Sequence, residues 1–188
     1  MSYLEYRVQT VPTGLSKVLY LSWPVILLLT AAAGLGFLML YSVAGGSMQP
    51  WAAPQMERFA IGMAVLFAIA MVPVWFWRNV AALAYAGSVL LLVAVEFVGV
   101  TGMGAQRWLD LGFMRLQPSE LMKITLVMML AAYYDWLDIR RTSRPFWVLL
   151  PVLLILLPTG LVLMQPDLGT AILLVAGGGL VMFAAGVH

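Results

Sequence analysis

Long apolar stretches recur along this chain, and short segments that hold most of the polar residues separate them. A helix needs about 20 consecutive, mainly apolar residues to cross the hydrocarbon core of a bilayer. The stretches that approach this length cover residues 21–43, 59–77, 79–100, 118–134, 146–164 and 168–187. The pattern therefore predicts six transmembrane helices, and it puts the boundary between the second and third at Trp77, Arg78 and Asn79.

The composition is that of a membrane protein. Of the 188 residues, 63% are hydrophobic and only 10% are charged, whereas a soluble domain carries about 25% charged residues. No low-complexity segment or soluble domain interrupts the spans. The predicted fold class is all-α, a polytopic membrane helix bundle that forms a single membrane domain over residues 1–188. The first apolar run exceeds the ~7 to 15 residues of a signal peptide, so it is interpreted as a retained helix.

The placement of Lys and Arg predicts the orientation in the membrane, because cytoplasmic segments are enriched in both. With the N-terminus in the cytoplasm, the inside segments carry six of them and the outside segments three. The inside residues are Arg7, Lys17, Arg78, Arg140, Arg141 and Arg144, and the outside residues are Arg58, Arg107 and Arg115. We therefore predict a cytoplasmic N-terminus, with residues 101–117 and the turn at 165–170 on the external side.

Several function classes are excluded by the residue inventory. The chain has no cysteine, which rules out disulfides and thiolate metal sites, and its single histidine is the last residue, His188. The net charge of +2 is small, and the basic residues flank the spans instead of forming one stripe. Nucleic acid is therefore not a predicted partner. Tryptophans such as Trp75, Trp77 and Trp136 fall near span ends, where indole rings anchor helices at the membrane interface.

Four ionisable residues are not explained by orientation, since they lie within or at the edge of apolar runs. They are Glu96, Glu120, Lys123 and Asp167. A charge at the centre of a membrane helix costs about 2.5 to 3.5 kcal/mol on an insertion scale, so such residues usually pair or face a wet cavity. In the predicted orientation, all four map to the external half of the membrane.

Three of these charges, Glu120, Lys123 and Asp167, also have a structural explanation. Glu120 and Lys123 follow Pro118, a favoured first helical residue, and they lie about 60° apart around a helix axis. They can form an ion pair that fixes the helix register, which on its own is as plausible as a catalytic role. Asp167 directly precedes the sixth predicted helix, where a carboxylate caps the helix N-terminus.

The convergence of charges on one side favours a functional site over independent structural roles. Arg107, Arg115, Glu120, Lys123 and Asp167 all approach the external face, which predicts a polar cavity open to the outside. Arginine binds phosphate oxygens through a planar fork, and lysine binds them as a point charge. A carboxylate can hold a divalent ion or accept a proton. The residues alone therefore predict a site for an anionic lipid or an ion.

Two long motifs give a more specific indication. The run GAQRWLDLGFMRLQPSELMK at 104–123 is followed about forty residues later by QPDLGT at 165–170. In this order and spacing, the motifs resemble the SEDS family (shape, elongation, division and sporulation) over residues 104–187. The segment GAQRWLDLG resembles the rod-shape RodA branch of the family more than the division FtsW branch. The first hundred residues match the family mainly by hydropathy.

The resemblance implies a peptidoglycan glycosyltransferase of the bacterial cytoplasmic membrane that polymerises lipid II on the external face for cell-wall elongation and rod shape. It implies a lipid-linked glycan strand as second substrate and a class B penicillin-binding protein as transpeptidase partner. In that frame Arg107, Arg115 and Lys123 are expected to contact the diphosphate. Glu120 and Asp167 are expected to order the cavity or to help bind a divalent cation, the one cofactor considered.

The chain also departs from the family pattern. SEDS proteins have about ten spans, and the aspartate thought to act in catalysis lies in an external loop after the seventh, beyond His188. The resemblance thus leaves the catalytic residue unassigned and favours a fragment of a longer protein. Two other functions stay open: a flippase or transporter for lipid-linked precursors, which typically has polar residues at several depths, and a noncatalytic scaffold that recruits cell-wall enzymes.

Overall fold

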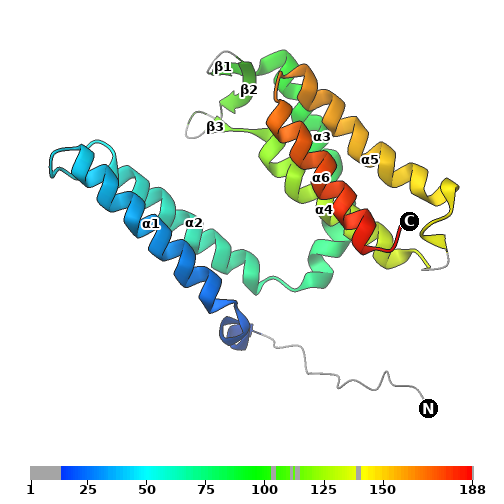
Figure 1. The fold of residues 1–188 in the computed structure, drawn as a ribbon, viewed down its shortest axis with the longest axis horizontal. Helices are drawn as coiled ribbons and strands as arrows, with labels where there is room; N and C mark the ends of the chain where they lie inside the picture. Colours follow the sequence, from blue (N-terminus) through cyan, green and yellow to red (C-terminus); the bar gives the residue numbers. More distant parts are fainter. Residues whose placement is uncertain (1–13, 103–104, 111, 113–114, 139–140, 188) are drawn as a thin grey trace. The chain divides into compact units, whose positions relative to one another are not determined.

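The computed structural model describes residues 14–102, 105–110, 112, 115–138 and 141–187 (Figure 1). Arg7, Arg140 and His188, which entered the predictions above, lie outside the described residues. The chain divides into two compact units, Met1–Pro73 and Val74–His188. Each unit is described by itself.

The first unit contains a short 3-10 helix and two long α-helices. These are η1 (Gly14–Tyr20), α1 (Trp23–Val43) and α2 (Ala52–Met71). The rings of Phe37 on α1 and Phe59 on α2 pack edge to face with centroids 5.7 Å apart. Lys17 Nζ donates a hydrogen bond of 2.9 Å to the carbonyl of Met71, the last residue of α2, where a cation is favourable. Most apolar side chains of both helices are exposed within this unit, as expected of membrane-spanning helices.

The second unit is a bundle of four helices with a small sheet at one end (Figure 1). The helices are α3 (Val74–Val98), α4 (Pro118–Trp136), α5 (Pro145–Met164) and α6 (Leu168–Ala184). Helix α4 packs against the other three. The buried core is apolar and consists of Tyr85, Leu92, Met122, Leu126, Leu130, Ile155, Val162, Ala171 and Leu174. Polar contacts also join the helices here: Thr125 Oγ1 on α4 donates to Ser88 Oγ on α3 at 3.1 Å, and the hydroxyl of Tyr85 on α3 donates to the carbonyl of Leu154 on α5 at 2.8 Å.

The external segment that was predicted only as a loop contains a three-stranded antiparallel sheet. Its strands are β1 (Val100–Gly102), β2 (Ala105–Asp110) and β3 (Arg115–Leu116), in the order β1-β2-β3. Thr101 pairs with Gln106, and Asp110 pairs with Arg115. Strands β1 and β3 have three and two residues, too few for the alternation over four to eight residues that identifies a strand. Strand β2 has six residues, AQRWLD, but apolar and polar residues do not alternate along it, so the hydropathy pattern did not predict the sheet.

All six predicted helices are present, but the predicted start of the second helix and its boundary with the third are wrong. The second helix begins at Ala52 instead of residue 59. Trp77, Arg78 and Asn79 lie inside α3, and the break falls at Val72 and Pro73. Val72 is extended, with ψ of 133°, because the ring of the following proline disfavours the helical conformation. Pro73 also lacks the backbone N–H that would continue α2. Because the side chains on both sides of this break are apolar, the hydropathy pattern did not indicate where α2 ends.

Four helices among the described residues are long and apolar enough to cross a membrane on their own: α1, α2, α3 and α5. Helix α6 is apolar but has 17 residues. Helix α4 carries Glu120, Lys123 and Asp135 within its 19 residues. These charges lower its hydropathy, and two of them belong to the predicted site.

Candidate functional site

Strand β2 is fixed to the end of α3 by Gln106. The side-chain amide of Gln106 donates to the carbonyls of Val95 at 3.0 Å and Gly99 at 2.8 Å. The Val95 carbonyl also accepts from the backbone N–H of Gly99 at 2.9 Å, so Gln106 adds a second donor at the point where the chain leaves α3. A Cβ on Gly99 would collide with the Val95 carbonyl and would lie 2.8 Å from Gln106 Cγ, so this close approach requires glycine. The arrangement positions the next residue of β2, Arg107.

Arg107 binds the turn between α5 and α6. Its Nε donates to the carbonyl of Gln165 at 2.9 Å, and Nη2 donates to the carbonyl of Pro166. Its Nη1 lies 3.9 Å from Asp167 Oδ2, and the side chains of Arg107 and Asp167 are 30% and 15% exposed. The planar guanidinium has five N–H donors in a fixed geometry, so a single side chain holds three successive residues of the turn.

Asp167 is the N-cap of α6, as its position before the helix predicted. Its Oδ1 accepts from the backbone N–H of Thr170 at 3.1 Å, and its Oδ2 accepts from Thr170 Oγ1 at 2.9 Å. A carboxylate at this place satisfies an unpaired N–H of the first helical turn and interacts favourably with the helix dipole. Both carboxylate oxygens of Asp167 are therefore engaged by the chain itself.

Gln165 is a site residue that the sequence analysis did not identify. Its side chain is 4% exposed, and Nε2 donates to the carbonyl of Leu92 on α3 at 3.3 Å. The turn is thus held by β2 through Arg107 and by α3 through Gln165. The spacing of Asp167 and Thr170, three residues apart before an apolar run, is a capping signal in the sequence. No comparable signal reveals the burial of Gln165.

Glu120 and Lys123 form the ion pair that their spacing predicted. Lys123 Nζ donates to Glu120 Oε1 at 2.9 Å, within the first turns of α4, which begins at Pro118 as expected. The Glu120 side chain is 58% exposed and the Lys123 side chain 28%. An exposed pair of this kind contributes little to stability, so both groups remain available to a ligand at the same end of the bundle.

Arg115 lies across the sheet from Asp110. Its Nε is 3.9 Å from Asp110 Oδ2, and the side chains are 65% and 44% exposed. Asp110 Oδ1 also accepts from the backbone N–H of Gly112 at 2.8 Å, which supports the turn after β2. Arg115 is the most exposed of the predicted site residues, and its contact with Asp110 is 3.9 Å long, so its guanidinium contributes little to holding the fold.

The elements that carry the five predicted residues, namely β2, β3, the start of α4 and the α5–α6 turn, lie together at one end of the second unit (Figure 1). The residues form three separate groups, namely Arg107 with Asp167, Glu120 with Lys123, and Arg115 with Asp110. Glu96 is exposed near the end of α3. Arg78 and Arg144 belong to the opposite end of the unit, since they lie near the starts of α3 and α5.

The donor set does not suit a metal ion. Within the described ranges, no group of three or more His, Cys, Asp or Glu residues is placed to hold one. The two carboxylates considered for a divalent cation differ: both oxygens of Asp167 accept hydrogen bonds from Thr170, whereas Glu120 accepts from Lys123 through Oε1. Divalent cations such as Mg²⁺ take oxygen ligands in an ordered shell, and this end of the unit offers no such shell from its described side chains.

Comparisons with known proteins identify the family. The sequence profile of the cell cycle protein family FTSW_RODA_SPOVE matches residues 22–188. The chain belongs to this family. It is 35% identical over 167 residues to peptidoglycan glycosyltransferase MrdB of Escherichia coli K12, covering 86% of this chain and 43% of that protein. It is 27% identical over 185 residues to the probable peptidoglycan glycosyltransferase FtsW of Pseudomonas fluorescens, covering 89% of this chain and 43% of that protein.

Solved structures share the fold. The crystal structure of the rod shape determining protein RodA of Thermus thermophilus aligns with a TM-score of 0.73 and 32% identity, over 88% of this chain and 54% of that one. A chain of a peptidoglycan synthase complex that coordinates polymerization and crosslinking aligns with a TM-score of 0.77 and 33% identity, over 87% of this chain and 47% of that one.

These matches confirm the SEDS family, with a RodA-like N-terminal part. They also confirm an all-α polytopic fold and a multi-pass protein of the bacterial inner membrane. The chain spans 43% of the length of the MrdB and Pseudomonas FtsW relatives. The roles of the individual site residues are predictions that the matches leave untested.

Proposed function

We propose that this chain forms part of a SEDS peptidoglycan glycosyltransferase that polymerises lipid II at the external face of the inner membrane during cell-wall elongation. The observation that carries the proposal is the grouping of Arg107, Arg115, Glu120, Lys123 and Asp167 at one end of a bundle whose family relatives are named peptidoglycan glycosyltransferases. Charged side chains at the end of a membrane bundle suit a lipid with an anionic headgroup.

The proposed reaction is an inverting glycosyl transfer. A sugar hydroxyl of one lipid II molecule attacks the anomeric carbon of the lipid-linked strand. The new C–O bond forms as the bond to the lipid diphosphate breaks, and the diphosphate leaves with the negative charge. Cations placed near the leaving oxygens would stabilise that developing charge. None of the five residues is assigned the role of the base that takes the hydroxyl proton.

The contacts of each residue support different roles. Arg115 and Lys123 are the proposed diphosphate ligands, because Arg115 is 65% exposed and Lys123 has one carboxylate partner at 2.9 Å. Glu120 would orient Lys123. Arg107 is proposed as a positioning residue instead of a ligand, since two of its nitrogens donate to backbone carbonyls of the turn. Asp167 would order the same turn.

A class B penicillin-binding protein is the proposed partner, with lipid II and the lipid-linked glycan strand as substrates. The related chain in a peptidoglycan synthase complex supports this proposal, because that complex couples polymerization to crosslinking. A divalent cation is not part of the proposal, given the absence of a suitable carboxylate group among the described residues.

The test is an assay of polymer formation. The product of the complete reading frame that encodes this chain is purified with its partner and supplied with lipid II, and the products are separated by gel electrophoresis. Glycan polymers that lysozyme digests are the expected result. MrdB of Escherichia coli with its own partner serves as positive control. The proposal is wrong if the control makes polymer and this protein, folded and bound to its partner, makes none.

A further inference from the structure

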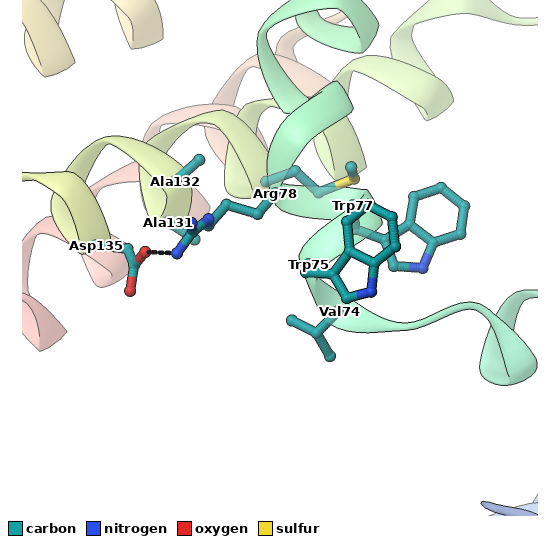
Figure 2. A pocket seen from close by; sticks show the side chains of 8 residues that line it. Val74, Trp75, Trp77, Arg78, Ala131, Ala132 and Asp135 are labelled. Carbon is teal, nitrogen blue, oxygen red and sulfur yellow. Dashed lines mark hydrogen bonds and ion pairs between the residues drawn. The ribbon is translucent and has the colours of Figure 1, made fainter. Parts of the chain in front are cut away.

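A groove opens on the second unit at the end opposite to the sheet, between the start of α3 and the last turns of α4 (Figure 2). Its volume is about 450 Å³, which lies in the range of small-molecule sites. The lining consists of Val74, Trp75, Trp77, Arg78, Met128, Ala131, Ala132 and Asp135. None of the residues proposed for glycosyl transfer lines this groove.

The floor of the groove is apolar and is formed by one face of α4. Met128, Ala131, Ala132 and Asp135 are spaced at i, i+3, i+4 and i+7, so they follow one another along that face. The two alanines leave space that larger side chains would fill. Since hydrocarbon is the solvent around a membrane helix, a groove of this kind accommodates an acyl chain without desolvating any polar group.

The mouth of the groove carries one cation and one anion. Arg78 Nη1 lies 2.7 Å from Asp135 Oδ2, and the two side chains are 59% and 57% exposed. One contact leaves the guanidinium with further N–H donors, and the carboxylate retains a second oxygen as acceptor. Both groups can therefore bind a ligand while they remain paired. Adjacent opposite charges complement a zwitterion better than a simple anion.

The flanking aromatic residues indicate that the pair lies at headgroup depth. Figure 2 shows Trp75 and Trp77 beside Arg78 at the start of α3, and the Trp75 side chain is exposed. At the end of α4, Trp136 packs against Trp147 with ring centroids 6.0 Å apart. Exposed indoles gather at the membrane interface, where the ring contacts hydrocarbon and the N–H contacts headgroups.

We propose that this groove binds a phospholipid whose zwitterionic headgroup carries a primary ammonium, as in phosphatidylethanolamine. The phosphate oxygens accept hydrogen bonds from Arg78, and the ammonium donates to Asp135. The first part of one acyl chain lies over Met128 and the alanines of α4. Phosphatidylglycerol has hydroxyl donors but no ammonium, so it would bring its negative charge near Asp135 without a compensating positive charge. Phosphatidylcholine has the charge but no N–H donor, so it also binds more weakly.

Native mass spectrometry tests the proposal independently of glycosyl transfer. The product of the complete reading frame is delipidated in detergent and titrated separately with phosphatidylethanolamine, phosphatidylglycerol and phosphatidylcholine. We expect phosphatidylethanolamine adducts to form at the lowest concentration. Loss of one charge-assisted contact should weaken that binding about tenfold in Arg78→Gln and in Asp135→Asn. The matched control is Arg144→Gln, which removes an exposed arginine at the same end that does not line the groove.

A second variant leaves the charges in place. Ala131→Leu fills the apolar floor, so it should reduce phosphatidylethanolamine adducts while Arg78 and Asp135 stay paired. Circular dichroism and thermal melting establish that each variant is folded, and the comparison of the three lipids needs no variant. Equal binding of phosphatidylglycerol and phosphatidylethanolamine would overturn the proposal. So would unchanged binding in the charge variants, or a wild-type protein that takes up no lipid because another protein segment covers the groove.

Discussion

Arg107 Nε lies 2.9 Å from the carbonyl oxygen of Gln165, a residue 58 positions later in the chain. This hydrogen bond joins β2 to the turn between α5 and α6, and Nη2 of the same side chain adds a second bond to Pro166. A guanidinium so engaged fixes the geometry of the turn. Arg107, which was expected to bind the diphosphate, therefore uses its guanidinium for hydrogen bonds within the fold.

The variant Arg107→Lys tests whether Arg107 acts by holding the α5–α6 turn through hydrogen bonds or by its positive charge alone. Lysine keeps the positive charge but lacks the planar fork that reaches two carbonyls and Asp167 together. We expect a loss of about 1 to 3 kcal/mol in stability, seen as a lower melting temperature of the purified protein, and a matching loss of polymerisation. Arg115→Lys is the control for the melting temperature alone, because the contact of Arg115 with Asp110 is exposed and 3.9 Å long. A variant with wild-type melting and activity would show that charge alone suffices at position 107.

Asp167→Asn tests the carboxylate of the α6 cap. Asparagine is also a good N-cap, so α6 should retain most of its stability, with a cost below about 1 kcal/mol. The charge that faces Arg107 at 3.9 Å is lost. We expect polymerisation to be abolished while membrane insertion, measured by fractionation, is unchanged. Asp110→Asn, on the exposed pair, is the comparison. Full activity of Asp167→Asn would remove this residue from the site.

Exchanging Glu120 and Lys123 tests whether the ion pair is only structural or whether Lys123 binds the diphosphate. The double variant Glu120→Lys with Lys123→Glu keeps the pairing and moves the cation toward the start of α4. The stability should change by less than about 1 kcal/mol, because exposed pairs and helix-dipole effects are both small. We expect polymerisation to fail, since the proposed diphosphate contact at position 123 is now a carboxylate. If the double variant polymerises lipid II normally, the pair is structural.

Hydropathy predicted the helices well because burial in lipid acts on every residue of a span. Hydropathy averaged over a span did not indicate the break at Val72 and Pro73. Proline lacks a backbone N–H and ends α2 there, although the neighbouring side chains are apolar. Hydropathy also gave no indication of the sheet, whose pairing depends on contacts such as Gln106 with the end of α3. Features set by one residue or one long-range contact were therefore missed.

The candidate site shows the same division. The Glu120–Lys123 pair and the Asp167 cap follow from local spacing on a helix, and the structure contains both. The contact of Arg107 with Gln165 spans 58 positions, and no local pattern encodes it. The sequence thus revealed which charges gather at one end, whereas the partner of each distant charge required the fold.

Gly178 allows α6 to lie close to α5 in the core of the second unit. A Cβ at this position would lie 2.5 Å from Cγ1 and 2.6 Å from Cδ1 of Ile155 on α5. Gly178→Ala should therefore push the two helices apart and cost about 1 to 3 kcal/mol through overpacking. Gly179→Ala is the matched control, because a Cβ added at this position would have no neighbouring atom within 4 Å. There alanine should stabilise the helix by roughly 0.5 to 1 kcal/mol.

The cause of the Gly178→Ala effect can be isolated by a double-mutant cycle. Ile155→Ala removes the atoms that the new Cβ would meet, so Gly178→Ala should cost less in that background than in the wild type. The melting temperatures of the four proteins give the coupling. If Gly178→Ala costs the same in both backgrounds, contact with Ile155 is not what requires glycine at this position. A large coupling would show that the absence of a Cβ at position 178 sets the spacing of α5 and α6. That spacing also affects the turn that Arg107 holds.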